Sequence, residues 1–248
     1  MARDRSPTGE ASPPRAWLSW SSGKDSAFAL HEVRRTGALN VVRLLTTVTD
    51  PFDRVSMHGV REAVLEAQAD ALGLPLEKVR IPHPCPNSVY ERAMAEVMAR
   101  AAADGVRHIV FGDLFLEEIR AYREEKLRAA GFEAVFPLWG RPTDRLARAM
   151  IAAGLRAYVC CLDPRKMPRE LAGRAFDEAL LAELPESVDP CGERGEFHTC
   201  VVALPDFQVP VEVRIGETVE RDGFVFTDLV PTSLRRPSGA DDPAVDRR

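Results

Sequence analysis

The sequence predicts an α/β protein in which a helix-covered parallel sheet is followed by a smaller α+β domain. Three observations lead to this fold class. Short apolar runs alternate with segments of helical periodicity through the first 140 residues, a turn of small residues directly follows the first apolar run, and the last third alternates with a period of two. Strands separated by helices imply right-handed crossovers, which make the strands parallel and place helices on both faces of the sheet.

The elements of the first domain are delimited by apolar spacing and by glycines. Apolar runs predict strands at residues 17–20, 41–47, 78–82, 108–111 and 133–136. Helical spacing predicts helices at residues 27–35, 59–72, 88–103 and 117–130. Gly73, Gly105 and Gly131 follow three of these helices and are suited to end them. In parallel sheets ligands bind beyond the carboxyl ends of the strands, where segments 21–26 and 46–50 and the pair Gly112-Asp113 would meet.

The pattern changes after Pro137. A helix at 144–153, a strand at 157–162 and a helical stretch at 174–183 precede segments that alternate with a period of two, at 197–204, 208–215 and 218–227. Such alternation is typical of antiparallel strands with one solvated face. We therefore predict a first domain at 16–137 and a second at 138–232, between polar tails at 1–15 and 233–248 that we expect to be disordered.

Composition excludes several function classes. The net charge is −5 and no basic tract is present, so no nucleic-acid partner is expected. No apolar run could span a bilayer, and the first residues lack the apolar core of a signal peptide, so neither a membrane nor secretion is predicted. Five cysteines, an odd number in a chain of 248 residues, do not indicate a disulfide framework. These features favour a reducing cytoplasm.

The hexapeptide Ser21-Ser22-Gly23-Lys24-Asp25-Ser26 is the strongest candidate site. It lies between a predicted strand and a predicted helix, where small residues let the backbone approach a ligand and free N–H groups point toward it. These properties predict a phosphate site. The chain contains 29 arginines but four lysines, so Lys24 in this turn suggests a need for a compact ammonium group. The alternative is an ordinary helix N-cap without a ligand.

Three other segments carry candidate chemistry. Asp113 could hold Mg²⁺ or cap a helix. Glu117, Arg120 and Glu124 share one helix face, which serves either a site or a solvated salt-bridged surface. The loop at 189–199 gathers two glycines, two glutamates, a cysteine, a histidine and a threonine, and its Cys191 is either a nucleophile or a buried structural thiol. For His58 a cap and a substrate contact both remain open.

In this order, four segments resemble the diphthine–ammonia ligase family of the adenine nucleotide alpha hydrolase-like (N-type ATP pyrophosphatase) superfamily. They are the hexapeptide at 21–26, residues 111–124, the Phe-Pro-Leu-Trp-Gly run at 136–140, and the loop at 191–199. The resemblance covers about residues 16 to 231. It implies a Rossmann-like, HUP-type ATP-binding domain followed by a family-specific domain, and an AMP-forming C–N ligase that adenylates a carboxylate and amidates it with ammonia.

The resemblance also assigns roles to residues. ATP and Mg²⁺ are the implied cofactors. The catalytic set is Lys24, Asp113, Glu117, Arg120, Glu124, Glu193 and Glu196. The nucleotide-binding set is Ser21, Ser22, Gly23, Lys24, Asp25, Ser26, Thr46 and Gly112. Asp25 and Asp113 are the candidate ligands of Mg²⁺. A homodimer is left open.

Ser22 stands where the superfamily usually has Gly, Arg194 where Gly is expected and His198 where an acidic residue is expected. The segment 47–59 also differs from the eukaryotic and archaeal form. These departures leave the acceptor open between diphthine and another carboxylate. Two other functions are weighed: an ATP pyrophosphatase that thiolates or otherwise modifies tRNA, and a non-catalytic adenine-nucleotide sensor.

Overall fold

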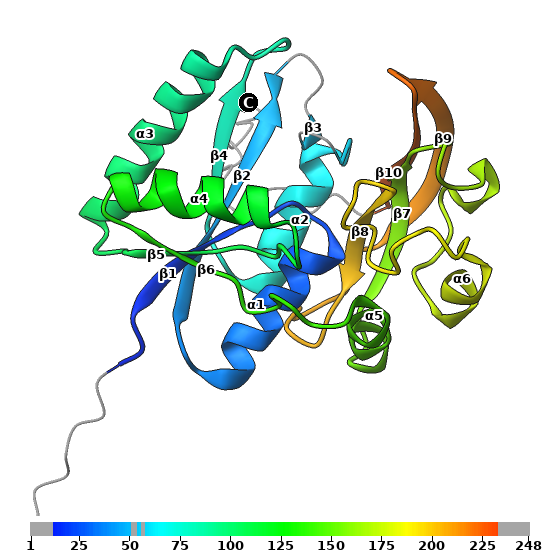
Figure 1. The fold of residues 1–248 in the computed structure, drawn as a ribbon, viewed down its shortest axis with the longest axis horizontal. Helices are drawn as coiled ribbons and strands as arrows, with labels where there is room; N and C mark the ends of the chain where they lie inside the picture. The colour runs from blue at the N-terminus through cyan, green and yellow to red at the C-terminus, as the bar shows by residue number, and fades with distance from the viewer. Residues whose placement is uncertain (1–11, 51–53, 56–57, 233–248) are drawn as a thin grey trace, which may run out of the picture.

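The computed structural model describes residues 12–50, 54–55 and 58–232 (Figure 1). Most of the two predicted tails falls outside this part of the chain. Of the predicted N-terminal tail, residues 12–14 are described and have no regular structure, and Arg15 already begins the first strand. No helix in the described ranges combines the length and the apolar character needed to cross a bilayer.

The first sheet has five parallel strands in the order β4-β2-β1-β5-β6. Their bounds are β1 (Arg15–Ser19), β2 (Asn40–Thr49), β4 (Leu76–Ile81), β5 (His108–Val110) and β6 (Glu133–Val135). A sixth, two-residue strand, β3 (Arg54–Val55), was not predicted and pairs antiparallel with β2. One side of β2 is paired with β4, and the other side is paired with β1 only as far as Leu45. Strand β3 pairs with the part of β2 beyond that point. The predicted α/β class is confirmed.

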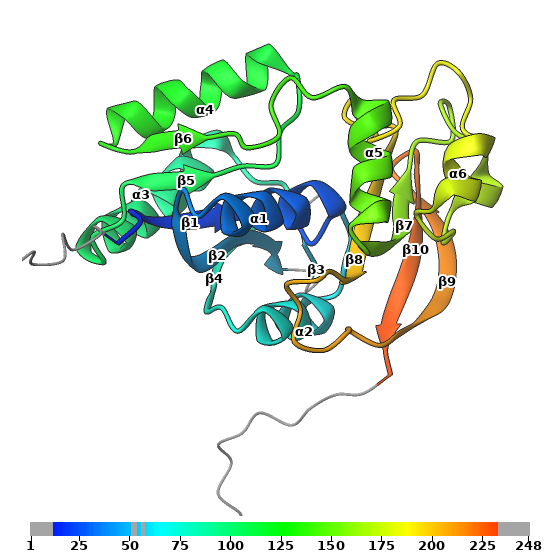
Figure 2. The ribbon, with the colours of Figure 1, turned by 90° about the horizontal axis from the view of Figure 1, so that it is seen from below.

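Helices cover both faces of this sheet (Figure 2). The helices are α1 (Lys24–Thr36), α2 (Glu62–Leu72), α3 (Asn87–Ala103) and α4 (Glu117–Ala129). Successive residues of β1 point to opposite faces: Leu18 belongs to the core cluster that includes α1 and α2, and Trp17 to the cluster that includes α3 and α4. The two apolar faces of the strand therefore account for the two helical layers.

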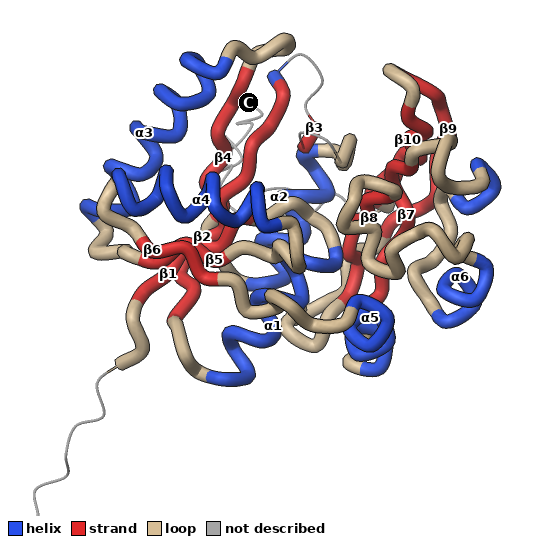
Figure 3. Tube along the Cα trace, in the orientation of Figure 1, coloured by secondary structure: helices blue, strands red, loops and turns tan. Residues whose placement is uncertain are grey.

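The second sheet is antiparallel, in the order β8-β7-β10-β9 (Figure 3). It is built from β7 (Arg156–Leu162), β8 (Phe197–Ala203), β9 (Val213–Arg221) and β10 (Phe224–Pro231), with α5 (Thr143–Ala152), α6 (Glu178–Glu183) and a short 3₁₀ helix at Arg169–Leu171. The predicted smaller α+β domain is thus present. The predicted boundary at 137/138 stays a prediction.

Two predicted strands were misplaced. The segments at 208–215 and 218–227 are replaced by β9 and β10, which join at Asp222-Gly223. Both turn residues have positive φ, 50° and 78°, as a two-residue hairpin turn requires. The helix predicted at 174–183 begins only at Glu178, because the Asp177 side chain accepts the Leu180 N–H at 2.8 Å and caps it there.

The two sheets share one continuous core, and polar contacts join their surfaces. The cluster that contains Leu18 also contains Val201 and Phe207 of the second domain. His31 Nδ1 lies 2.7 Å from Asp206 Oδ2, and Arg61 Nη2 lies 2.6 Å from Asp228 Oδ2. The second domain is therefore packed against the α1–α2 face of the first.

We expect Gly59→Ala to destabilise the protein by about 2–4 kcal/mol, because two costs add there. Gly59 has φ +66°, and a Cβ atom on it would lie 2.8 Å from Cδ1 of Phe226 in the second domain. Gly37 is the matched control, with the same φ of +66° and nothing within 4 Å of its Cβ position, so Gly37→Ala should cost about 1 kcal/mol. Urea denaturation measures both. Equal losses would mean that the Phe226 contact is relieved without cost.

Candidate functional site

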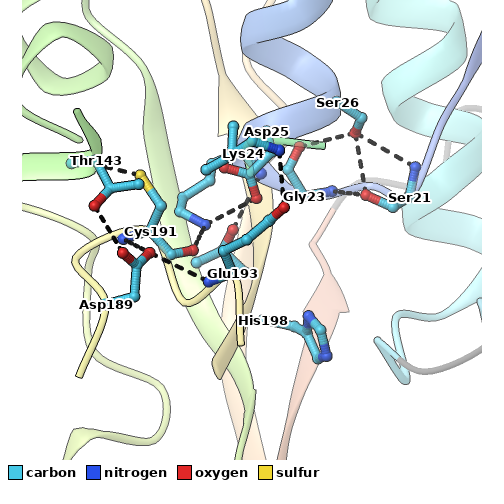
Figure 4. Close-up of polar contacts among 12 residues, drawn as sticks. Ser21, Gly23, Lys24, Asp25, Ser26, Thr143, Asp189, Cys191, Glu193 and His198 are labelled. Atoms are coloured by element: carbon cyan, nitrogen blue, oxygen red, sulfur yellow. Dashed lines mark hydrogen bonds and ion pairs between the residues drawn. The ribbon is translucent and has the colours of Figure 1, made fainter. Parts of the chain in front are cut away.

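The segment Ser21–Ser26 forms a tight loop between β1 and α1, at the carboxyl edge of the first sheet. Gly23 is the N-cap of α1, its N–H lies 3.3 Å from Ser21 Oγ, and Ser26 Oγ donates to the Gly23 carbonyl at 3.0 Å. Ser21 and Ser26 also join through their hydroxyls at 3.2 Å (Figure 4). We call residues 21–26 the phosphate loop, after the ligand that the sequence predicts for it.

Ser22 has the left-handed conformation that makes glycine common at such positions. Its φ is 69°, which costs about 1–2 kcal/mol for a residue with a Cβ atom. The Ser22 carbonyl accepts hydrogen bonds from the Val201 N–H at 2.9 Å and from Gln68 Nε2 at 3.2 Å. Gln68, which is fully buried, also accepts from Trp20 Nε1 at 2.9 Å. The strained turn is therefore held by hydrogen bonds from one residue of α2 and one residue of β8.

Lys24 points into the junction between the two domains. Its side chain is 1% exposed, and Nζ donates to Asp25 Oδ2 at 2.9 Å and to the Cys191 carbonyl. The ammonium group also lies 5.1 Å from the ring centroid of Phe197 and 5.6 Å from that of Phe176. Burial lowers the pKa of Lys24. The negatively charged neighbours, Asp25 first among them, together raise it by more, so the pKa lies above its ordinary value.

Asp25 and Asp113 lie at the same edge of the sheet. A Cβ atom on Gly112 would lie 2.7 Å from the Asp25 carbonyl carbon and the Ser26 nitrogen, so only glycine lets the loop after β5 approach α1 this closely. Burial raises the pKa of both aspartates, although Lys24 opposes the rise at Asp25 and Arg123, 3.2 Å from Asp113 Oδ2, opposes it at Asp113. Asp25 Oδ1 is buried, and no hydrogen-bond donor of the described residues reaches it.

The loop at 189–199 of the second domain closes over this edge. Asp189 organises it: Oδ1 accepts the N–H groups of Cys191 at 2.9 Å and Glu193 at 3.3 Å, and Oδ2 accepts from Thr143 Oγ1 at 2.7 Å. Glu193 then reaches back to the first domain, where its Oε1 accepts the Leu114 N–H at 2.8 Å. The loop is therefore fixed to both α5 and the segment after β5.

The Glu193 carboxyl group of the site has a strongly raised pKa. Burial raises its pKa to about 7, and the nearby negative charges of Asp25 and Asp113 add to this rise, against the opposing hydrogen bond from Leu114. Displaced pKa values of this size are frequent where charged ligands bind or protons move. The carboxyl group of Glu193, from the second domain, is therefore influenced by Asp25 of the phosphate loop and by Asp113 of the segment after β5.

Two family models match the chain, the diphthamide synthase N-terminal domain over residues 15–134 and the diphthamide synthase C-terminal domain over residues 142–228. The chain belongs to the diphthamide synthase (diphthine–ammonia ligase) family. A curated relative, the diphthine–ammonia ligase of Schizosaccharomyces pombe, is 23% identical over 219 residues, which cover 81% of this chain and 36% of the relative. The chain thus spans about a third of that relative's length, and the predicted family is confirmed.

Some residues that the family resemblance assigned lie away from the phosphate loop. Glu196 is 2% exposed and its Oε1 accepts the Asp189 N–H at 3.2 Å, inside the loop itself. Arg120 pairs with Glu124 at 2.7 Å and stacks on Phe136 and Trp139. Among the described residues, no hydrogen bond, ion pair or ring contact joins Arg120 or Glu124 to the phosphate loop, and Glu117 is exposed on the same helix. Their predicted catalytic roles stay predictions.

The predicted role of Thr46 in nucleotide binding stays a prediction. Thr46 is buried in β2, directly after Leu45, whose carbonyl accepts the Trp20 N–H at 2.7 Å where β1 ends. The sequence analysis missed Gln68, and it named Thr199 as part of the loop at 189–199 without giving it a role. Thr199 Oγ1 accepts the Lys24 N–H at 3.1 Å, and both residues support the phosphate loop from outside it. A glutamine among the apolar positions of α2 is a signal that could have identified Gln68.

The cysteines of the family loop are buried. All five cysteines are free thiols, and Cys191 and Cys200 are 1% and 0% exposed. Burial raises the pKa of Cys200 to about 12 and that of Cys191 above its ordinary range. Cys191 Sγ lies 3.5 Å from the Thr143 carbonyl oxygen. These surroundings favour the structural interpretation of Cys191, because a nucleophilic thiol needs a lowered pKa.

Proposed function

We propose that the chain is an ATP-dependent, AMP-forming ligase that activates a carboxylate and amidates it with ammonia. A carboxylate oxygen of the acceptor attacks the α-phosphorus of ATP, the bond to the bridging oxygen breaks, and pyrophosphate leaves. The nitrogen of ammonia then attacks the acyl carbon, AMP leaves with the bonding electron pair, and the nitrogen loses a proton. The acceptor is diphthine or another carboxylate, on a small molecule or on a protein side chain.

One observation carries this proposal: the phosphate loop, which includes Asp25, lies beside the carboxyl groups of Asp113 and Glu193 from two other segments. The loop supplies N–H and hydroxyl donors where phosphate charge would lie, and such fixed donors stabilise a leaving anion. Lys24 supports the loop from within the domain junction, where its ammonium group holds Asp25 and the second-domain loop together.

The residues fit a magnesium ion. No group of three or more metal-binding side chains lies close together in the described part of the chain. Mg²⁺ does not require one, because it is usually held by one or two carboxylates together with substrate phosphates. Asp25, with its unpartnered buried Oδ1, and Asp113 would hold it. When bound, the ion would neutralise phosphate charge.

The buried thiols speak against the alternative of tRNA thiolation, because Cys191 and Cys200 are both inaccessible and hard to ionise. The non-catalytic sensor remains an alternative that the experiment below separates. The cytoplasmic setting, the absence of a nucleic-acid partner and a homodimer stay predictions.

Phosphorus NMR of the protein with Mg-ATP tests the proposal, with and without ammonium and a mixture of carboxylate metabolites. We expect AMP and pyrophosphate, formed faster when both the acceptor and ammonium are present. Asp113→Asn should slow this reaction, whereas Asp104→Asn, at the far end of α3, should not. ADP and phosphate would contradict the proposal. ATP that is bound and left intact under all conditions would favour the sensor.

A further inference from the structure

Two histidine rings from different domains meet beside the phosphate loop. His58 lies between β3 and α2, and His198 is the second residue of β8. Their ring centroids are 4.4 Å apart and their planes are tilted by 40°. Figure 4 shows the His198 ring pointing away from Cys191 and the loop around it. The reaction steps proposed above use neither ring.

The His58 ring reaches the backbone of the phosphate loop. Its Nε2 lies 3.3 Å from the point where a Cβ atom on Gly23 would stand, and Ser21 Oγ lies 3.3 Å from the same point. Gly23 is the N-cap of α1, so both groups lie at the positive end of a helix. A ring nitrogen, a hydroxyl group and a helix start together favour an anion at this place.

The turn that carries His58 is held in position by both domains. The Val55 N–H donates to the Val60 carbonyl at 2.8 Å, and Arg54 Nη1 donates to the Gly59 carbonyl at 2.6 Å. Arg54 also contacts Asp228 of β10 at 3.0 Å. The Phe226 ring packs on Gly59, the residue that follows His58, so the second domain also contacts this turn.

The His198 ring beside His58 is uncharged at neutral pH. Burial lowers the pKa of His198 to about 4, and the neighbouring charge of Lys24 adds to this effect. At neutral pH His198 therefore does not repel a proton on His58. An uncharged aromatic ring such as that of His198 interacts favourably with a neighbouring ring that donates or carries a proton, such as that of His58.

We propose that His58 binds the β- and γ-phosphates of the nucleotide, and hence the pyrophosphate leaving group, while His198 acts as a positioning residue for the His58 ring. The ligand class is the terminal phosphate groups of a nucleoside triphosphate. This inference rests on the proposed function, since it assumes that ATP occupies the phosphate loop.

Isothermal titration calorimetry with Mg-ATP, AMP and inorganic pyrophosphate tests it. We expect His58→Gln to weaken the binding of Mg-ATP and pyrophosphate about tenfold or more, as the loss of a hydrogen bond to a charged group does, and to leave AMP binding unchanged. His198→Ala should weaken the same two ligands less, and His198→Phe, which retains a ring face, should restore most of the affinity. His108→Gln, at the opposite end of β5, is the matched control.

The outcomes separate the two proposals. If the wild-type protein does not bind Mg-ATP, the proposed function fails and this inference fails with it. If the wild-type protein binds Mg-ATP and His58→Gln binds it equally well, or loses AMP binding to the same degree, only this inference fails. NMR of the wild-type protein with ¹⁵N-labelled histidine needs no variant: pyrophosphate should shift the His58 Nε2 resonance and leave that of His108 in place. An unshifted His58 resonance would overturn the inference.

Discussion

Replacing Lys24 with methionine is expected to lower the free energy of unfolding by about 3 kcal/mol. Methionine fills much of the same volume but leaves the Asp25 carboxylate without its partner, and breaking a buried pair from one side costs about 3–5 kcal/mol. The lower end of that range applies because Asp25 is 27% exposed whereas Lys24 is 1% exposed. Urea denaturation at pH 7 measures the difference.

Two further variants make this result specific. Lys126→Met removes a lysine from an ion pair with Glu91 in which both side chains are 52% exposed, so it should leave the free energy of unfolding close to the wild-type value. The double variant Lys24→Met/Asp25→Asn removes both charges and should recover part of the lost stability. A Lys24→Met protein that unfolds at the wild-type urea concentration would show that the pair contributes nothing.

The same substitution should also weaken nucleotide binding, although Lys24 does not project out of the loop. Its ammonium group joins Asp25 of the phosphate loop to the Cys191 carbonyl of the second domain. Without this bridge the loop at 189–199 loses one of its attachments to the first domain. Lys24 therefore combines the predicted site role with a role in domain packing, which its place in the motif does not reveal.

The sequence best predicts those elements that have both a regular spacing of apolar residues and a residue that marks their end. Helix α3 begins one residue from its prediction and ends as predicted, because apolar spacing defines it and Gly105 follows its end. Strand β3 has two residues, too few for any period to be visible. The β9–β10 hairpin was misplaced although Asp222-Gly223 is a recognisable turn, because alternation continues on both sides and conceals the point of reversal.

In the site, contiguous residues could be predicted and side-chain directions could not. The phosphate loop was predicted as a unit because six neighbouring residues carry the pattern. The burial of Lys24 depends on how the loop at 189–199 packs on the phosphate loop, 167 residues earlier in the chain. No local pattern contains that information, since it arises from the packing of two domains.

Replacing Glu193 with glutamine is expected to stabilise the protein above pH 7 and to leave its stability unchanged near pH 4.5. Burial, together with the charges of Asp25 and Asp113, raises the pKa of the Glu193 carboxyl group to about 7 in the native state, above its ordinary value of 4.5. Between these two values the native state holds a proton that the unfolded state has lost. The wild-type protein must therefore lose stability as the pH rises from 4.5 to 7, and then level off.

Glutamine carries no titrating proton, and its amide oxygen can still accept the Leu114 N–H that Glu193 accepts at 2.8 Å. The variant should therefore lack this part of the pH dependence. A full shift of this size would correspond to about 3 kcal/mol, and solvent screening of the half-buried side chain reduces the expected gain at pH 8 to about 1–2 kcal/mol. Urea unfolding at pH 5, 6, 7 and 8, without nucleotide or metal, gives the two curves.

Glu186→Gln is the control, because Glu186 lies exposed in the segment that leads to the same loop. Its curve should run parallel to that of the wild-type protein. If Glu193→Gln also runs parallel between pH 5 and 8, Glu193 does not hold a proton in this range. The site would then carry one more negative charge at neutral pH than the structure indicates, which would strengthen its attraction for a cation and weaken its attraction for the phosphates of a nucleotide.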